Sequence, residues 1–275
     1  VDSVRWLDRQ ARHLVLTQAP LTVAPLLQAI VQAGSTPQAW VFTSATLGDS
    51  DDLQWFTRTC GLPEARTLRV ASPFDYATQA SLYVPPDAPP VQAQAAHSAF
   101  VARLAQVGAQ QLGGRTLVLT TTLKALQAIG NHLQQQFGQA GGLFTAIDVL
   151  VQGQGSKHAL LERFRQGTVH GRGCVLVASA TFWEGVDIAG DALQLLIIDK
   201  LPFAPPDDPL VQARTHQLEG LGLNAFNDYL LPEAAMALKQ GVGRLIRSET
   251  DQGMVVIADT RLLEKAYGPR LLAAL

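Results

Sequence analysis

The stretch Gln194-Leu195-Leu196-Ile197-Ile198-Asp199 sets four apolar residues in a row between two polar ends. A short apolar run of this kind is typical of a β-strand that is covered on both faces, as the strands of parallel sheets are. A proline-rich loop follows it, which ends the strand at Asp199. The stretch therefore predicts a buried strand of a parallel sheet.

Strands and helices alternate on both sides of this strand. Predicted strands cover residues 13–17, 39–43, 67–71, 80–84, 115–119, 147–151, 174–178 and 254–259. Predicted helices cover residues 22–31, 51–59, 91–112, 123–137, 157–165, 209–218, 232–247 and 261–266. Such alternation predicts an α/β fold in which a largely parallel sheet carries helices on both faces.

The composition indicates a folded protein without a membrane span. Of 275 residues, 47% are apolar and only 16% are charged, and no apolar run approaches the roughly 18 residues of a transmembrane helix. With 21 basic and 23 acidic residues the net charge is −2, so a nucleic-acid contact would be local or would use backbone amides and hydroxyls. The two cysteines, Cys60 and Cys174, favour a reduced cytoplasmic protein without a metal site. The start lacks a leader pattern and an initiator methionine, so we expect a piece of a longer chain.

The segment from Gln240 to Arg247, Gln-Gly-Val-Gly-Arg-Leu-Ile-Arg, continues a helical pattern that begins near Pro232. At about 100° per residue, Gln240, Arg244 and Arg247 fall on one helical stripe. Guanidinium groups are planar, charged and forked, so two of them one turn apart suit a terminal phosphate. Each of the two glycines costs a helix roughly 1 kcal/mol, which indicates a close approach at this point. Taken alone, an R-x-x-R pattern also fits arginines that simply face solvent.

Four turns with hydroxyls or glycines follow predicted strands, at 44–46, 120–122, 152–156 and 179–187. In a parallel sheet all four would open on one edge, where α/β folds place ligands. Amides at helix starts bind phosphates without many lysines, which suits a net charge of −2. For Ser44 to Thr46 helix capping is the better explanation of the hydroxyls taken alone, and for Thr120 to Thr122 it explains them at least as well as a ligand does.

The turn Phe182-Trp183-Glu184-Gly185-Val186-Asp187 has an unusual composition for a plain loop, with a tryptophan and two carboxylates around a glycine. Asp187 has the chemistry to bond a ribose hydroxyl or an arginine, and Glu184 to position the arginine-bearing helix. The alternative is a packed aromatic residue beside solvated acids.

Together these motifs resemble those of superfamily 2 helicases. Ser44-Ala45-Thr46 resembles motif III, the turn from Phe182 to Asp187 resembles motif V, and Gln240-x-x-Gly243-Arg244-x-x-Arg247 resembles motif VI. The fuller strings at 72–76, 182–187, 197–203 and 239–247 resemble the DinG/YoaA branch of the XPD-like helicases. The resemblance covers nearly the whole chain.

The resemblance implies a RecA-like motor lobe and assigns roles to individual residues. Arg244 and Arg247 would be arginine fingers. Contacts to the nucleotide or its cleft would come from Gln240, Gly243, Glu184, Gly185 and Asp187. Contacts to or near nucleic acid would come from Ser44, Thr46, Thr120, Thr121, Thr122, Gln152 and Thr181. The family acts as ATP-driven 5′-to-3′ DNA helicases in DNA repair, so ATP, Mg²⁺ and single-stranded DNA are the expected ligands.

The departures from the family pattern limit what this chain does by itself. It contains no G-x-x-x-x-G-K-[ST] phosphate loop and no D-E-x-H box. The family's iron–sulfur cluster needs four cysteines, and the two cysteines of this chain lie in the wrong places for it. Residues 1–48 therefore resemble the C-terminal remnant of the first lobe, and residues 49–275 the second lobe. ATP and Mg²⁺ would be shared with the missing first lobe, and the cluster would lie in the missing part. We expect the chain alone to be inactive.

Two alternatives of another class remain open. One is a non-catalytic DNA-binding or partner-docking module on the same fold. The other is a free-standing domain for a sugar nucleotide or small ligand, since a fold does not fix a function.

Overall fold

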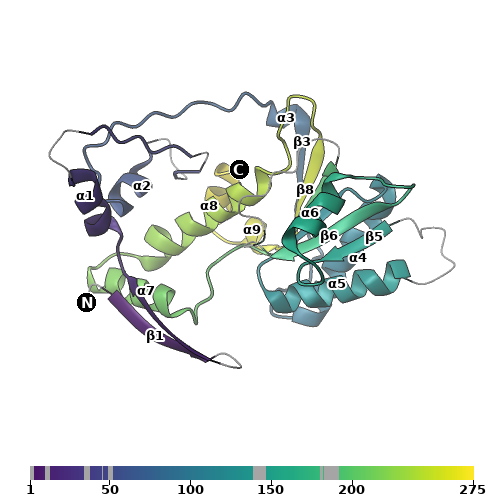
Figure 1. The fold of residues 1–275 in the computed structure, drawn as a ribbon, viewed down its shortest axis with the longest axis horizontal. Helices are drawn as coiled ribbons and strands as arrows, with labels where there is room; N and C mark the ends of the chain where they lie inside the picture. Colours follow the sequence, from purple (N-terminus) through teal and green to yellow (C-terminus); the bar gives the residue numbers. More distant parts are fainter. Residues whose placement is uncertain are drawn as a thin grey trace. The chain divides into compact units, whose positions relative to one another are not determined.

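The structure is a computed structural model, and it describes residues 3–9, 13–33, 38–44, 46–48, 52–138, 147–179, 182 and 192–275. The chain folds into two compact units (Figure 1). One contains residues 1–71, 203–237 and Ala274, and the other contains residues 72–202, 238–273 and Leu275. The assignment of residues 1–48 to a first motor lobe stays a prediction.

The described part of the second unit contains a sheet of six strands. In spatial order they are β3 (Ala80–Tyr83), β8 (Gly253–Ile257), β7 (Leu195–Ile198), β4 (Thr116–Thr120), β6 (Gly173–Ser179) and β5 (Ile147–Val151). Each neighbouring pair in this sheet is parallel. The prediction of a parallel sheet is confirmed, and the apolar run at 195–198 lies inside it between β8 and β4.

Helices α4 (Gln94–Leu112) and α5 (Leu123–Gly138) cover one face of this sheet (Figure 1). Two glycines let them approach closely. A Cβ at Gly108 would collide with Leu195 Cδ2, and one at Gly130 would lie 2.9 Å from Val151 Cγ2. The core on this face consists of residues such as Val101, Ile129, Val118, Val177 and Ile197, all fully buried.

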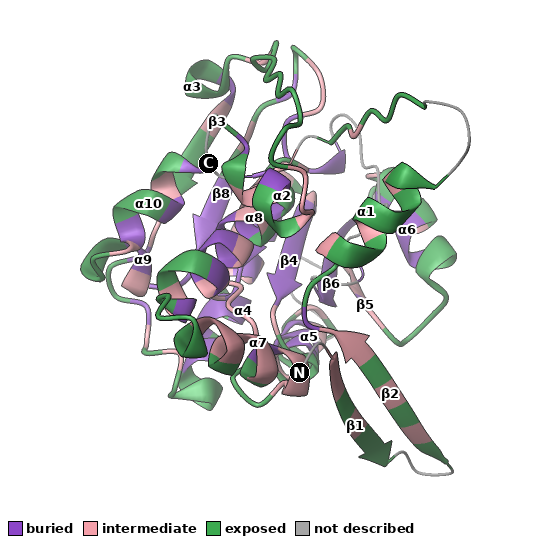
Figure 2. Ribbon diagram, turned by 90° about the vertical axis from the view of Figure 1, so that its left-hand side faces the viewer, coloured by how far each residue is buried: buried purple, intermediate pink, exposed green. Residues whose placement is uncertain are grey.

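The opposite face carries α6 (Lys157–Arg165) and the C-terminal part of α8 (Leu231–Val242). Because side chains alternate along a strand, Leu119 and Ile198 point away from the core that contains Val118 and Ile197. Gly241 of α8 lies against both, since a Cβ there would lie 3.6 Å from Ile198 Cδ1 and 3.7 Å from Leu119 Cδ1. The prediction of helices on both faces is confirmed. Every residue of β4 and β6 is buried, as the strand colours in Figure 2 show.

The first unit joins the N-terminal segment to residues 203–237. Strands β1 (Ser3–Arg9) and β2 (Leu14–Pro20) form an antiparallel hairpin, followed by the short helices α1 (Ala24–Gln32) and α2 (Gln54–Thr59). Residues 203–237 supply α7 (Pro209–Gly220), a π-helical turn at Phe226–Leu230 and the start of α8. Arg214 of α7 donates from Nε to the Leu21 carbonyl oxygen at 3.2 Å and from Nη1 to Tyr229 Oη at 3.3 Å. The arginine thereby holds the two segments together.

Two predicted strands are wrong, and one strand was not predicted. Residues 39–43 and 67–71 form no strand, although the first segment is rich in aromatic and β-branched residues and the second contains two β-branched ones. Val41 and Val70 are 81% and 79% exposed, so these segments have neither a partner strand nor a core to cover. The strand that was not predicted is β1, whose sequence lacks a strong apolar pattern. It is extended because it forms an antiparallel ladder with β2. In the described ranges, we find no helix with both the length and the apolar character that a bilayer crossing needs.

Candidate functional site

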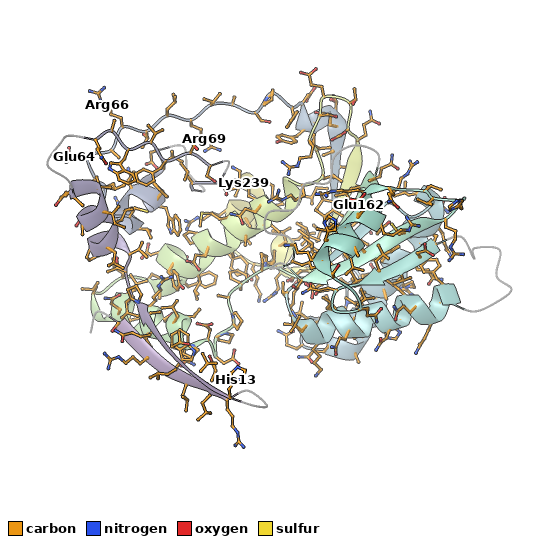
Figure 3. The ribbon with its side chains drawn as sticks, viewed as in Figure 1. His13, Glu64, Arg66, Arg69, Glu162 and Lys239 are labelled. Atoms are coloured by element: carbon orange, nitrogen blue, oxygen red, sulfur yellow. The ribbon has the colours of Figure 1, made fainter. Side chains whose placement is uncertain are left out.

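Helix α8 ends at Val242, two residues before Arg244. Gly243 N donates to the carbonyl oxygen of Lys239 at 2.9 Å, and Arg244 N donates to the carbonyl oxygen of Gly241 at 3.3 Å. Figure 3 labels Lys239. The predicted helix through Arg247, and with it the common stripe of Gln240, Arg244 and Arg247, is wrong. Glycine has a low helix propensity, and the helix ends between Gly241 and Gly243.

The segment after the helix buries two consecutive apolar residues. Leu245 and Ile246 are each 3% exposed, whereas the flanking Arg244 and Arg247 are only half-buried. Gly253 makes room for Leu245, because a Cβ at Gly253 would lie 2.7 Å from Leu245 Cδ1. The arginines are therefore attached to a backbone that its apolar side chains anchor to the sheet.

Of the other predicted nucleotide contacts, Gln240 and Gly243 are exposed at the end of α8. Glu184, Gly185 and Asp187 lie outside the described residues. Phe182 of the same turn is described and is 7% exposed. The ammonium group of Lys157, at the start of α6, lies 5.3 Å from the centre of its ring, within the range of a cation–π interaction.

The turns after β4 and β7 meet at the carboxyl edge of the sheet. Asp199, which follows β7 and is 1% exposed, accepts at Oδ1 from Thr121 N at 2.9 Å and from Lys200 N at 2.8 Å. Lys200 Nζ lies 3.8 Å from Asp199 Oδ2. The backbone amide of Thr121 belongs to a turn that the sequence predicts as a phosphate contact. In the structure this amide instead donates to the Asp199 carboxylate. Burial raises the pKa of Asp199 to about 6, although Lys200 and the two amides oppose the shift.

The three threonines after β4 occupy different environments. Thr120 is 1% exposed and donates from Oγ1 to the Ala178 carbonyl oxygen at 3.5 Å. Thr121 is half-buried beside Asp199. Thr122 is exposed, and its Oγ1 accepts from Ala125 N at 3.2 Å in the first turn of α5. Capping, one of the two interpretations of these hydroxyls, therefore applies to Thr122.

The turns after β5 and β6 also meet at this edge. Gln152 Oε1 accepts from Ser179 N at 2.8 Å and from Ser179 Oγ at 2.9 Å. Thr181, two residues beyond Ser179, lies outside the described residues. Ser44 and Thr46 belong to the first unit, where Ser44 Oγ accepts from Thr46 N at 3.1 Å in a local turn. The common edge predicted for the turns after β4, β5 and β6 is confirmed for their described residues.

Two acidic residues of this edge were not singled out from the sequence. The first is Asp199. The second is Asp259, 1% exposed, which accepts at Oδ2 from Leu201 N at 2.9 Å and pairs with Arg261. Burial opposes its ionisation, but the hydrogen bonds from Arg261 and Leu201 prevail and lower its pKa. The available signal was an acidic residue at the end of an apolar run, since Asp199 follows residues 195–198 and Asp259 follows residues 254–258.

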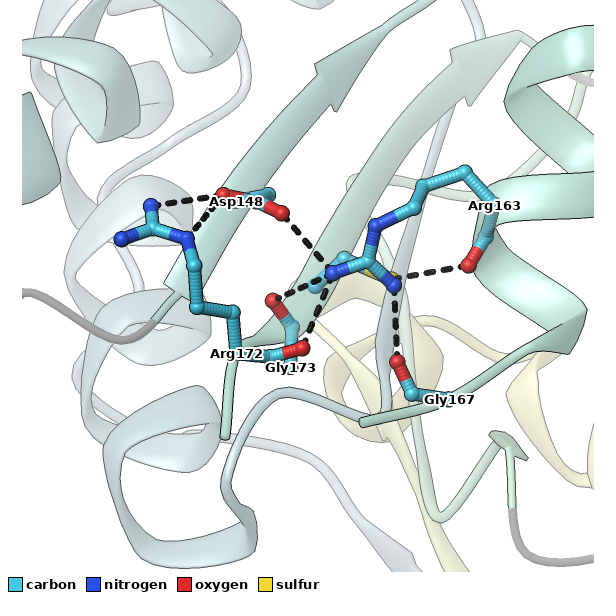
Figure 4. Close-up of polar contacts among 6 residues, drawn as sticks. Asp148, Arg163, Gly167, Arg172 and Gly173 are labelled. Carbon is cyan, nitrogen blue, oxygen red and sulfur yellow. Dashed lines mark hydrogen bonds and ion pairs between the residues drawn. The ribbon is translucent and has the colours of Figure 1, made fainter. Parts of the chain in front are cut away.

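A further polar cluster lies at the amino end of the strands, away from this site. Arg163 Nη2 and Arg172 Nη2 pair with Asp148, and Arg163 also donates to the carbonyl oxygens of Gly167, Arg172 and Gly173 (Figure 4). These bonds join the end of α6 to β5 and β6. The cluster is structural and is a suitable control for experiments at the carboxyl edge.

The raised pKa of Asp199 predicts a pH-dependent contribution to stability. A carboxyl that titrates near pH 6 when folded and at its usual 3.8 when unfolded binds more protons in the folded state, so stability is lost as pH rises from about 4 to 6. The difference corresponds to at most about 3 kcal/mol. Asp199→Asn keeps an acceptor for both amides and removes the buried charge. Thermal unfolding across this pH range should therefore show the variant gaining stability relative to the wild type, whereas parallel curves would contradict the assignment.

Comparison with known proteins agrees with the motifs. Residues 106–275 match the family model described as the helicase C-terminal domain. The ATP-dependent DNA helicase YoaA of Escherichia coli K12 is 40% identical over 270 residues, which cover 98% of this chain and 40% of that protein. The ATP-dependent helicase DinG of Mycobacterium tuberculosis H37Rv is 35% identical over 280 residues, 99% of this chain and 40% of that protein.

A solved structure named XPD_Helicase superposes with a TM-score of 0.59 at 14% identity, over 94% of this chain and 45% of that one, and so shares the fold. The chain spans about two fifths of the length of the YoaA and DinG relatives. Because the parallel sheet, the order of the motifs and these matches agree, the chain belongs to the helicase C-terminal domain family, in the DinG/YoaA-like branch of the XPD-family helicases.

Proposed function

We propose that the chain is the second motor lobe of an ATP-dependent DNA helicase, with residues 1–48 as the end of the first lobe. In the polypeptide that carries both lobes, ATP binds between them, and its hydrolysis drives movement along single-stranded DNA. The relatives' names support ATP-dependent DNA helicase activity. The 5′-to-3′ direction and the role in DNA repair follow from the family resemblance, and the cytoplasmic location from the two separate cysteines.

The observation that carries this proposal is the arrangement of residues 243–247. Two half-buried arginines flank the buried pair Leu245 and Ile246, so their backbone is anchored. Forked cations on an anchored backbone suit the charge that develops on a transferred phosphoryl group. We assign Arg244 and Arg247 to the γ-phosphate. Gln240 and Gly243 contact the nucleotide, and Glu184, Gly185 and Asp187 line the cleft.

Single-stranded DNA is proposed to run past the loops that carry hydroxyl and amide groups. The residues assigned to it are Ser44, Thr46, Thr121, Thr122, Gln152 and Thr181. Thr120 acts indirectly, because its hydroxyl is buried and bonded to Ala178. Neutral donors and acceptors of this kind bond phosphates and sugars without a strongly basic surface, in agreement with the net charge of −2.

Neither metal group of the family fits the described residues of this chain. Nowhere in the described ranges do three or more His, Cys, Asp or Glu side chains gather as a set of ligands. Cys60 and Cys174 belong to different units and are too few for a four-cysteine cluster. We therefore assign the Mg²⁺ ligands and the iron–sulfur cluster to the rest of the polypeptide and derive no step through either.

The test uses the two-lobe polypeptide, with ATP hydrolysis measured with and without single-stranded DNA. We expect strong stimulation by DNA, and displacement of streptavidin from the 3′ end of a biotinylated strand but not from the 5′ end. Hydrolysis that is indifferent to DNA would contradict the motor function. Displacement from the 5′ end alone would contradict the direction while leaving the motor function in place.

A further inference from the structure

Arg247 lies beyond the end of α8 at Val242, so helical hydrogen bonds do not fix its backbone. Asp251 holds its backbone. Asp251 Oδ2 accepts from Arg247 N at 2.8 Å and from Ser248 N at 2.9 Å, and Oδ1 accepts from Ser248 Oγ at 2.6 Å. The hydrogen bonds from Ser248 and Arg247 outweigh the effect of burial and lower the pKa of Asp251, so it is ionised at neutral pH.

Gln79, which directly precedes β3, holds the same turn. It is the last residue of α3 (Tyr76–Gln79) and is 8% exposed. Its Nε2 donates to the Ser248 carbonyl oxygen at 2.9 Å and to that of Asp251 at 3.0 Å. Nearly 170 residues separate the partners in sequence, but the next residue, Ala80, pairs with Gly253 in the parallel ladder of β3 and β8. The sheet therefore places Gln79 directly beside the turn.

We propose that Gln79 and Asp251 are positioning residues that fix the backbone of Arg247 for its contact with the γ-phosphate. The inference rests on the function proposed above. Asp251 satisfies the amides at the start of the turn, and Gln79 satisfies two of its carbonyl oxygens, so both polar sides of the turn are held by buried side chains. Loss of the bonds from Gln79 or of those to Asp251 would leave partly buried backbone groups without these partners and let the arginine shift.

The test is steady-state ATP hydrolysis by the two-lobe polypeptide at saturating single-stranded DNA. A displacement of about 1 Å in a catalytic group can cost 100-fold in rate. We therefore expect Gln79→Leu and Asp251→Ala to lower kcat by about 100-fold, with KM for ATP changed less than about twofold, because an arginine finger acts on the transition state. Asp251→Asn keeps a carbonyl oxygen for both amides and should restore kcat to within about threefold of the wild type.

The matched control is Asp148→Ala at the amino end of the strands. It removes two ion pairs, with Arg163 and Arg172, and should lower the melting temperature without lowering kcat. Should Gln79→Leu fail to fold, Ser248→Ala removes the hydroxyl donation to Asp251 Oδ1, together with the hydroxyl's contacts to Thr250, and should still lower kcat several-fold with KM unchanged.

The outcomes separate this inference from the proposed function. Folded Gln79→Leu and Asp251→Ala variants with wild-type kcat, or with a change in KM alone, would overturn the positioning role while an inactive Arg247→Ala variant preserved the motor function. An equal loss of kcat in Asp148→Ala would also overturn it, because general destabilisation would then explain the effect. Wild-type turnover in Arg247→Ala would instead remove the function on which the inference rests.

Discussion

Replacing Arg247 with alanine in the two-lobe polypeptide should lower kcat for ATP hydrolysis by about 1,000-fold, in the range that arginine fingers contribute to phosphoryl transfer. The side chain supplies charge and paired hydrogen bonds to the phosphoryl oxygens as the bond to the leaving group breaks. Leu245 and Ile246 anchor the segment by burial, so removal of the guanidinium should leave the local backbone in place. The measurement is phosphate release at saturating ATP and DNA.

Two further variants show whether the loss reflects the role of this arginine. Arg247→Lys should also be strongly impaired, because an ammonium group cannot reproduce the planar fork of a guanidinium. Arg172→Ala removes a half-exposed arginine at the opposite edge of the sheet and should retain normal turnover. Normal turnover in Arg247→Ala would contradict the finger role. Single-stranded DNA binding that survives loss of both Arg244 and Arg247, together with normal turnover, would favour the non-catalytic binding module.

The 275-residue chain by itself should hydrolyse ATP no faster than a buffer control. Phosphoryl transfer needs a phosphate-binding lysine and Mg²⁺ ligands, and the sequence contains neither a G-x-x-x-x-G-K-[ST] loop nor a D-E-x-H box. The loss of hydrolysis is expected to be complete because the chain supplies arginines for the transition state but no loop that binds the phosphates.

Contamination by another ATPase is excluded by comparing the chain with its Arg247→Ala variant. Equal background rates are expected for the two. Clear turnover by the chain that Arg247→Ala abolishes would show that one lobe suffices for hydrolysis, and would contradict the proposed division of the site between two lobes.

The sheet of the second unit was predictable because its local signals and its tertiary structure agree. Apolar runs such as 195–198 can be buried only between two layers of helices, and they are. Helix α6 occupies the predicted residues Lys157–Arg165, because Ser156 caps its start through a bond from Ala159 N at 3.2 Å and Gly167 follows its end with a φ of +62°. Cap and stop residues are local signals, so the sequence carries them directly.

The candidate site was predictable in its motifs but not in its geometry. The 3.6-residue period predicts a helix through Arg247, whereas Leu245 and Ile246 are buried side by side after the helix has ended. The bonds that hold the arginine segment come from Gln79, nearly 170 residues away, and no local pattern indicates such a partner. For the same reason, the hydroxyl-rich turn does not indicate that Asp199 engages Thr121 N.

A structure of the two-lobe polypeptide with ADP and aluminium fluoride, a mimic of the transferred phosphoryl group, tests the central claim most directly. The account predicts that the guanidinium group of Arg247, Arg244 or both donates hydrogen bonds of about 2.7–2.9 Å to the fluoride ligands. A closed complex in which both guanidinium groups face solvent, with the fluoride contacted only by residues of the other lobe, would contradict it.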